Sequence, residues 1–125
     1  MHLLLVEDNP GDVFLVREAI ETFIEQGTLQ VSTVEDGAQA LAFLRRQAPY
    51  TNAAQSDLVL TDLNFPGKSG YDLLAELKQD PELKYIPVVV LTSTANPRDV
   101  NRCYELGANA SLVLVHDRSW GIACK

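Results

Sequence analysis

The chain has little cysteine, few basic residues and no long apolar run. Its two cysteines, Cys103 and Cys124, fit no CxxC or CxxxC metal-binding pattern and are interpreted as a reduced intracellular pair. Ten basic residues against seventeen acidic ones give a net charge of −7, which argues against nucleic acid as a partner because phosphate backbones need basic patches. No apolar run approaches the roughly 18 residues of a membrane span, and the start MHLLLVEDNP has the wrong length and flanks for a signal peptide. We therefore expect a cytoplasmic protein that contacts neither membrane nor nucleic acid.

Five short apolar segments are typical of buried β-strands. At 125 residues the chain is long enough to bury a core, and we expect one domain, residues 1–125. The apolar segments lack the spacing of helices and are bounded by turn residues, as in the central strands of a parallel sheet. They cover residues 2–7, 29–34, 58–62, 86–91 and 110–115.

Between these strands, apolar residues recur every three or four positions, as in amphipathic helices. Strand and helix alternate four times, which predicts right-handed crossovers and an open parallel sheet covered on both faces, the doubly wound α/β class. The segment HDRSWGIACK that follows the fifth strand is too short for another full helix. The predicted helices run from Asn9 to near Gly27, from Gly37 to Leu44, around Leu73–Leu77 ending before Asp80, and from Asn96 to Gly107.

Acidic and hydroxyl side chains stand where three of the strands end. Glu7 and Asp8 follow the first strand, Asp62 ends the third, and Thr92 and Ser93 end the fourth. In a parallel sheet these ends share one edge, where ligand sites form. Crowded carboxylates repel each other unless a cation lies among them, and Mg²⁺ takes a few carboxylates together with waters and a phosphate. An aspartate beside Mg²⁺ can act as a nucleophile that forms an aspartyl phosphate.

Each of these residues also has a plainer interpretation. Glu7 and Asp8 would serve as acids at the start of a helix, where the helix dipole favours them. Asp62 would cap the turn that follows it, and Thr92 would be a solvated strand end. Their joint placement at three successive strand ends of one pattern favours a common site.

Four segments, VEDNPGD, DLVLTDLNFPGKSG, IPVVVLTSTA and ELGANA, resemble in order and spacing the receiver domain of two-component response regulators. The resemblance runs from about Leu3 to Ala110. VEDNPGDVFLVREA and DLNFPGKSGYDLLAELK more closely resemble single-domain receivers paired with bacterial phytochromes. The resemblance to receiver domains implies a flavodoxin-like sheet of five parallel strands in the order 2-1-3-4-5. It also implies a phosphorelay protein that takes a phosphoryl group from a sensor histidine kinase and signals through protein partners, without separate catalytic activity.

The resemblance gives each residue at the acidic edge a role. Asp62 would be the phosphoacceptor. Asp8 would hold Mg²⁺ directly, and Glu7 would hold it through a water. Asp62 would be a further ligand of the metal. Asn64 would add its backbone carbonyl to the metal and would flank the phosphoryl group.

The same resemblance assigns a switch and a loop. Thr92 would be the switch hydroxyl that moves toward the phosphoryl group, with Ser93 as the small neighbour that leaves room for it. Thr94 would flank the phosphoryl group and influence its hydrolysis. Pro66, which also flanks the phosphoryl site, and Gly70 would shape the loop after the acceptor.

The chain departs from the family pattern after about residue 110, in a divergent tail of residues 111–125. Receivers carry a lysine at the end of the fifth strand, and that position is Leu114 here, followed by Val115. The aromatic switch position falls on Ser111, and the last helix is truncated or missing. Two interpretations stay open: a degenerate switch, or a C-terminus altered by truncation or a shifted reading frame.

A missing last helix would leave apolar residues of the fifth strand without a cover. Exposed apolar surface favours association. We therefore predict a homodimer or a rearranged tail around Leu112, Val113 and Leu114.

Three other functions compete with the receiver. A pseudo-receiver that binds partners without being phosphorylated stays an open alternative because of Leu114. A Mg²⁺-dependent phosphatase with Asp62 as nucleophile is disfavoured, since such enzymes commonly carry a second aspartate where this chain has Asn64. A flavodoxin-like cofactor carrier is disfavoured because no phosphate-cradling loop follows the first strand.

Overall fold

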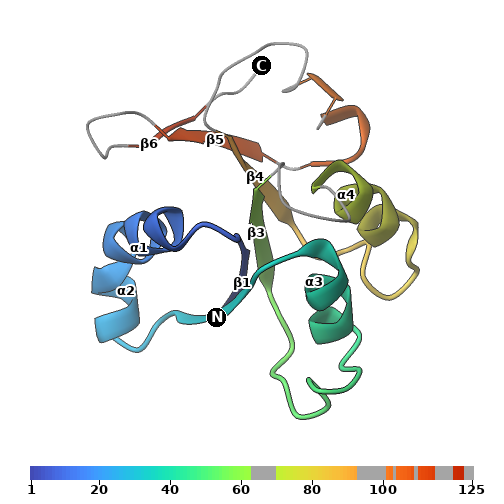
Figure 1. The fold of residues 1–125 in the computed structure, drawn as a ribbon, viewed down its shortest axis with the longest axis horizontal. Helices are drawn as coiled ribbons and strands as arrows, with labels where there is room; N and C mark the ends of the chain where they lie inside the picture. Colours follow the sequence, from blue (N-terminus) through green and yellow to red (C-terminus); the bar gives the residue numbers. More distant parts are fainter. Residues whose placement is uncertain (63–69, 93–100, 103, 109, 115–119, 123–125) are drawn as a thin grey trace.

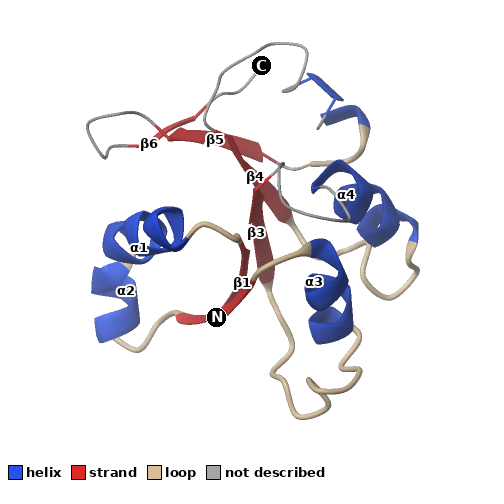
Figure 2. Cartoon of the chain, viewed as in Figure 1, coloured by secondary structure: helices blue, strands red, loops and turns tan. Residues whose placement is uncertain are grey.

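The computed structural model describes residues 1–62, 70–92, 101–102, 104–108, 110–114 and 120–122. Its centre is a six-stranded sheet in the order β2-β1-β3-β4-β5-β6, with α1 and α2 on one face and α3 and α4 on the other (Figures 1 and 2). Within the described residues, no helix is long and apolar enough to cross a membrane. The strands are β1 (His2–Val6), β2 (Gln30–Val34), β3 (Leu58–Asp62), β4 (Val88–Thr92), β5 (Ala110–Leu114) and β6 (Trp120–Ile122).

The five predicted strands and their order are confirmed. β1 pairs in parallel with β2 and with β3, β3 pairs with β4, and β4 pairs with β5. In β1, the run Leu3–Val6 is almost completely buried, and Val59 and Val88 in the neighbouring strands are fully buried. Continuous burial on both faces explains why these strands are apolar runs without alternation.

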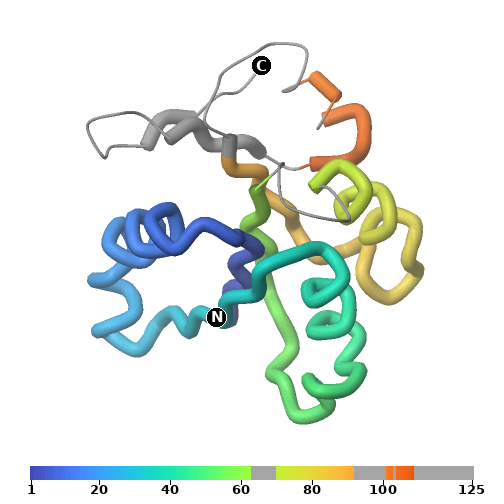
Figure 3. Tube along the Cα trace, viewed as in Figure 1, coloured from blue at the N-terminus to red at the C-terminus, as the bar shows by residue number. Residues whose placement is uncertain are grey.

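The chain crosses from one face of the sheet to the other, as Figure 3 traces, and builds a core on each. Because successive side chains of a strand point to opposite faces, Leu4 and Val6 pack on the side of α3 and α4, while Leu3 and Leu5 pack on the side of α1. The helices are α1 (Pro10–Ala19), α2 (Glu21–Glu25), α3 (Gly37–Leu44) and α4 (Gly70–Gln79), and residues 101, 102, 104 and 105 are also helical.

The first helix differs from its prediction, since one helix to near Gly27 was expected and two are present. Ile20 separates α1 from α2 with φ −110° and ψ 10°, outside regular helical geometry. Apolar residues continue at helical spacing across this break, so the sequence does not reveal it. Phe23, which continues the helical spacing of Val16 and Ile20 beyond the break, is 54% exposed.

Asn9 fixes the start of α1, immediately after the acidic residues that follow β1. Its side-chain Oδ1 accepts hydrogen bonds from the backbone N–H of Gly11 at 2.8 Å and of Asp12 at 3.3 Å. Pro10 begins the helix, a position where its missing N–H costs nothing. The predicted helix start is therefore confirmed.

Asn9→Ala is expected to lower the free energy of unfolding by about 1 kcal/mol, because two N–H groups lose their acceptor. Urea unfolding measures the change. Asn9→Ser, which keeps a capping oxygen, should stay within a few tenths of a kcal/mol of the parent. Equal stability of the alanine variant and the parent would show that the cap contributes nothing.

Gly107 closes the helical segment before β5, as predicted. Its φ of +108° lies in the left-handed region, and its N–H donates to the carbonyl of Tyr104 at 3.0 Å. A Cβ at this position would lie 2.7 Å from Cγ of Lys78, so α4 also requires glycine here. Both the backbone and the packing thus select this residue.

The tail contains a strand that the sequence did not predict. β6 pairs antiparallel to β5, with Leu114 opposite Trp120 and Leu112 opposite Ile122. A tail too short for a helix and its connection is long enough to turn back and pair as a strand. The side chains of Leu112, Val113 and Leu114, on which the predicted dimer depends, lie outside the described part, so the dimer stays a prediction.

Candidate functional site

The ends of β1 and β3 bring the predicted acidic residues together. Val6 pairs with Thr61, so the next residues, Glu7 and Asp62, are neighbours at the carboxyl edge of the sheet. The N–H of Glu7 donates to the carbonyl of Val34 at 2.9 Å, which extends the pairing of β1 with β2 by one residue. The hydroxyl of Thr61, fully buried, donates to the carbonyl of Asp62 at 2.9 Å. The backbone on both sides of the site is therefore fixed by the sheet.

Glu7, Asp8 and Asp62 form an acidic cluster. One carboxylate oxygen from each of the three residues lies within 4.8 Å of the others. Glu7 is buried, Asp62 is half-buried and Asp8 is exposed, so the cluster opens to solvent on the side of Asp8. Oxygen ligands at this spacing, with one side open, suit a hard divalent cation that keeps some of its waters.

The electrostatics of Glu7 support a cation site. The pKa of Glu7 is raised from 4.5 to about 8, mainly by burial. The backbone N–H of Asn9, which donates to Oε1 at 3.0 Å, lowers this pKa, whereas the charges of Asp62 and Asp12 and a hydrogen bond with Asp8 raise it. Without a cation, a proton therefore occupies the cluster at neutral pH. A divalent cation would replace that proton and neutralise the crowded carboxylates.

β4 and β5 end at the same edge. Asp62 pairs with Leu91, which places the backbone of Thr92 one residue further along, and Thr92 pairs with Val113. Leu114, the position where the family pattern has lysine, is then the last residue of β5 at this edge, and Ser111 pairs with Val90. The side chains of Thr92, Ser111 and Leu114 lie outside the described part.

The remaining predicted site residues are mostly outside the described chain. Asn64, Pro66, Ser93 and Thr94 all lie there. Gly70 is described: it is buried and is the first residue of α4.

Sequence reasoning missed two residues that act on Glu7. The backbone N–H of Asn9 bonds to its carboxylate, and the charge of Asp12 raises its pKa. Asn9 lies two residues after an acid that ends a strand. This spacing is the signal in the sequence for the hydrogen bond between the Asn9 N–H and the Glu7 carboxylate.

The strand order, together with an acidic cluster at the carboxyl ends of β1 and β3, defines a doubly wound α/β domain of the response-regulator class. The family model for the response regulator receiver domain matches residues 3–113, and the chain belongs to this family. It is therefore a relative of the response regulators of two-component signalling, as the sequence predicted.

Named relatives agree with this assignment. Response regulator Rcp1 of Synechocystis sp. (strain ATCC 27184 / PCC 6803 / Kazusa) is 46% identical over 110 residues, which cover 88% of this chain and 74% of Rcp1. The structure of the phosphorylated cyanobacterial phytochrome response regulator RcpA matches with a TM-score of 0.85 and 42% identity, over 94% of this chain and 82% of RcpA. The Mn²⁺-bound form of Rcp1 matches with a TM-score of 0.82 and 44% identity, over 92% and 81% of the two chains.

Proposed function

We propose that this receiver accepts a phosphoryl group on Asp62 from the phosphohistidine of a sensor histidine kinase. The acidic cluster of Glu7, Asp8 and Asp62 is the observation that supports this most strongly. Asp62 is the only member of the cluster on β3, and it is accessible enough to react, since it is half-buried.

In the proposed reaction a carboxylate oxygen of Asp62 attacks phosphorus, the bond between phosphorus and the histidine nitrogen breaks, and an aspartyl phosphate forms. The fixed ends of β1 and β3 hold Asp62 beside Glu7 and Asp8, so the nucleophile is oriented before the donor arrives. Such a reaction brings negative phosphoryl oxygens to a negative cluster. A bound divalent cation supplies the positive charge that lowers this repulsion.

Mg²⁺ is the cation we propose. Glu7, Asp8 and Asp62 would hold it, and the backbone carbonyl of Asn64 would add a further oxygen. The donors are all oxygen, which Mg²⁺ prefers. The relative Rcp1 has a solved Mn²⁺-bound form, and Mn²⁺ has a similar preference for oxygen ligands.

Thr92 would be the switch hydroxyl, with Ser93, Thr94 and Pro66 around the phosphoryl group. Leu114 at the lysine position removes one charge-assisted contact, which we expect to cost about 1.5–3 kcal/mol of stabilisation of the phosphorylated state. Phosphorylation would then proceed while the conformational response weakens. Leu114 also supports the second candidate function, a pseudo-receiver that binds partners without phosphorylation.

A phytochrome kinase is the partner class that we infer, because RcpA is a phytochrome response regulator and two further relatives, RtBRR and AtBRR, are bacteriophytochrome response regulators. Signalling would proceed through a protein partner in the cytoplasm, with the homodimer as the proposed assembly. The chain would accept a phosphoryl group on its own aspartate and would not turn over a separate substrate.

Incubation of the chain with acetyl phosphate and Mg²⁺ tests the proposal. Intact mass spectrometry should show the gain of one phosphoryl group, and peptide mapping should place it on the segment that contains Asp62. Chelation of the metal should prevent the gain. No adduct under any condition would overturn the proposal in favour of the pseudo-receiver, and catalytic release of phosphate from diverse esters would favour the phosphatase.

A further inference from the structure

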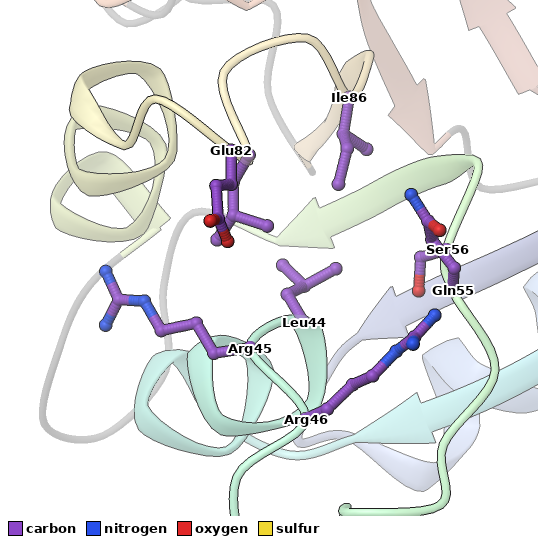
Figure 4. Close-up of a pocket in the computed structure, with 8 residues that line it drawn as sticks. Leu44, Arg45, Arg46, Gln55, Ser56, Glu82 and Ile86 are labelled. Atoms are coloured by element: carbon purple, nitrogen blue, oxygen red, sulfur yellow. The ribbon is translucent and has the colours of Figure 1, made fainter.

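A cavity of about 270 Å³ lies at the opposite edge of the sheet from the acidic cluster. Ser56 precedes β3 by two residues and Ile86 precedes β4 by two residues, so the cavity is at the amino-terminal ends of these strands. The end of α3 and the segment after α4 complete its wall, with Leu44, Arg45, Arg46, Glu82 and Leu83 (Figure 4). No role in the acidic site involves these residues.

Ser56 brings an unsatisfied polar group to this cavity. The residue is only 4% exposed, and among the described residues its Oγ has no hydrogen-bond partner. Buried polar groups in native proteins are nearly always paired. An unpaired hydroxyl in the wall of a cavity therefore has a hydrogen bond to offer to a bound group.

Arg46 brings a positive charge at an unusual backbone position. Its φ is +54°, and its N–H donates to Phe43 O while the N–H of Gln47 donates to Ala42 O, the bonding of a helix cap that normally uses glycine. The chain carries arginine there despite the unfavourable backbone conformation. Figure 4 shows its side chain extending toward Gln55 and Ser56.

Arg46 is also available for a ligand. Its neighbour Arg45 donates from Nε to Oδ2 of Asp80 at 3.3 Å, whereas Arg46 makes no ion pair within the described residues. A guanidinium without an ion-pair partner is suited to a carboxylate, which it binds with two parallel hydrogen bonds.

The rest of the cavity restricts the ligand further. Leu44, Leu83 and Ile86 give it an apolar wall, and Glu82 lies across from Arg46 (Figure 4). A second negative charge on the ligand would face Glu82 and be repelled. The volume suits a metabolite rather than a larger cofactor.

We propose that this cavity binds a small monocarboxylate with an apolar body. Its carboxylate accepts hydrogen bonds from Arg46 and Ser56, and its apolar body packs on Leu44, Leu83 and Ile86. The site is independent of phosphorylation, so its failure leaves the function of Asp62 untouched.

Titration of the full chain with 4-methylpentanoate, followed by amide NMR shifts, tests the proposal. Saturable shifts are expected at the cavity residues, at lower concentration than for the neutral 4-methylpentanamide or for inorganic phosphate. No saturable shift, or equal binding of the amide, would overturn the site. Tighter binding of phosphate would overturn the proposed ligand class.

Two variants separate binding from folding. Arg46→Gly suits the positive φ, and Ser56→Ala removes the unpaired hydroxyl, so neither should lower the urea midpoint of unfolding. Each should weaken binding of 4-methylpentanoate about tenfold or more. Arg17→Ala is the control: it removes a cation from α1, on the other face of the sheet, and should leave binding within about twofold. Unchanged binding in both Arg46→Gly and Ser56→Ala would overturn the proposal.

Discussion

An Asp62→Asn variant is expected to form no phosphoryl adduct with acetyl phosphate and Mg²⁺, while the parent chain is modified. An amide is a far weaker nucleophile than a carboxylate, and Glu7 and Asp8, which follow β1, are the proposed metal ligands rather than acceptors. Intact mass spectrometry under identical conditions measures the difference. An adduct of equal yield in the variant would show that another residue is the acceptor.

Asp57→Asn is the matched control for this variant. Asp57 precedes the first residue of the same strand, β3, at its other end, and its Oδ2 accepts a hydrogen bond from the N–H of His2 at 2.8 Å. An asparagine there removes the same charge and still offers an oxygen to that N–H. Full phosphorylation of Asp57→Asn would tie the loss in Asp62→Asn to the acidic cluster rather than to the net charge.

A Glu7→Gln variant is expected to change how the stability of the metal-free chain depends on pH. The folded pKa of Glu7 is raised from 4.5 to about 8, so folding favours the protonated carboxyl. Its stabilising contribution is fully present below about pH 4.5 and is lost as the pH rises to about 8. Glutamine mimics the protonated form at every pH. The variant should therefore be closer to the parent in stability at pH 5 than at pH 8, and at pH 8 it should exceed the parent by at least about 1 kcal/mol, the equivalent of roughly one pKa unit.

Urea unfolding across this pH range, with and without Mg²⁺, measures the effect. Mg²⁺ should stabilise the parent more at pH 8 than at pH 5, because the cation competes with a proton. Glu35→Gln is the matched control: Glu35 follows the end of β2 as Glu7 follows the end of β1, but it is exposed. A parent whose stability did not fall between pH 5 and pH 8 would show that Glu7 is ionised in the metal-free protein.

The parts of the fold and site that the sequence predicted are those with local signals. Leu58–Asp62 is an apolar run that ends in a carboxylate and loop residues, and it forms β3 with Asp62 at the tip. The alternation of strands and helices then implied a parallel sheet, in which Glu7 and Asp8 lie at the same edge as Asp62. One carboxylate oxygen from each of the three residues does lie within 4.8 Å of the others. The assignment of Leu114 to the lysine position at the end of β5 rested on the resemblance to receivers, counted from Gly107.

The missed features depend on contacts between segments that are distant in the sequence. The raised pKa of Glu7 comes mainly from burial between neighbouring strands, which no local pattern encodes. The cavity beside Ser56 is formed by the end of α3, the start of β3 and the segment before β4. The break at Ile20 was hidden because apolar residues keep helical spacing on both sides of it.

The pairing of β1 between β2 and β3 sets an order of assembly during synthesis. β1 is made first, yet His2 is bonded to Asp57, 55 residues further along the chain. The apolar run Leu3–Val6 therefore leaves the ribosome long before both of its neighbouring strands exist. Contacts so distant in the sequence slow folding, so we expect the acidic cluster to be completed only once β3 has emerged. Until then the nascent chain carries an unpaired apolar strand, which makes it a candidate for chaperone binding.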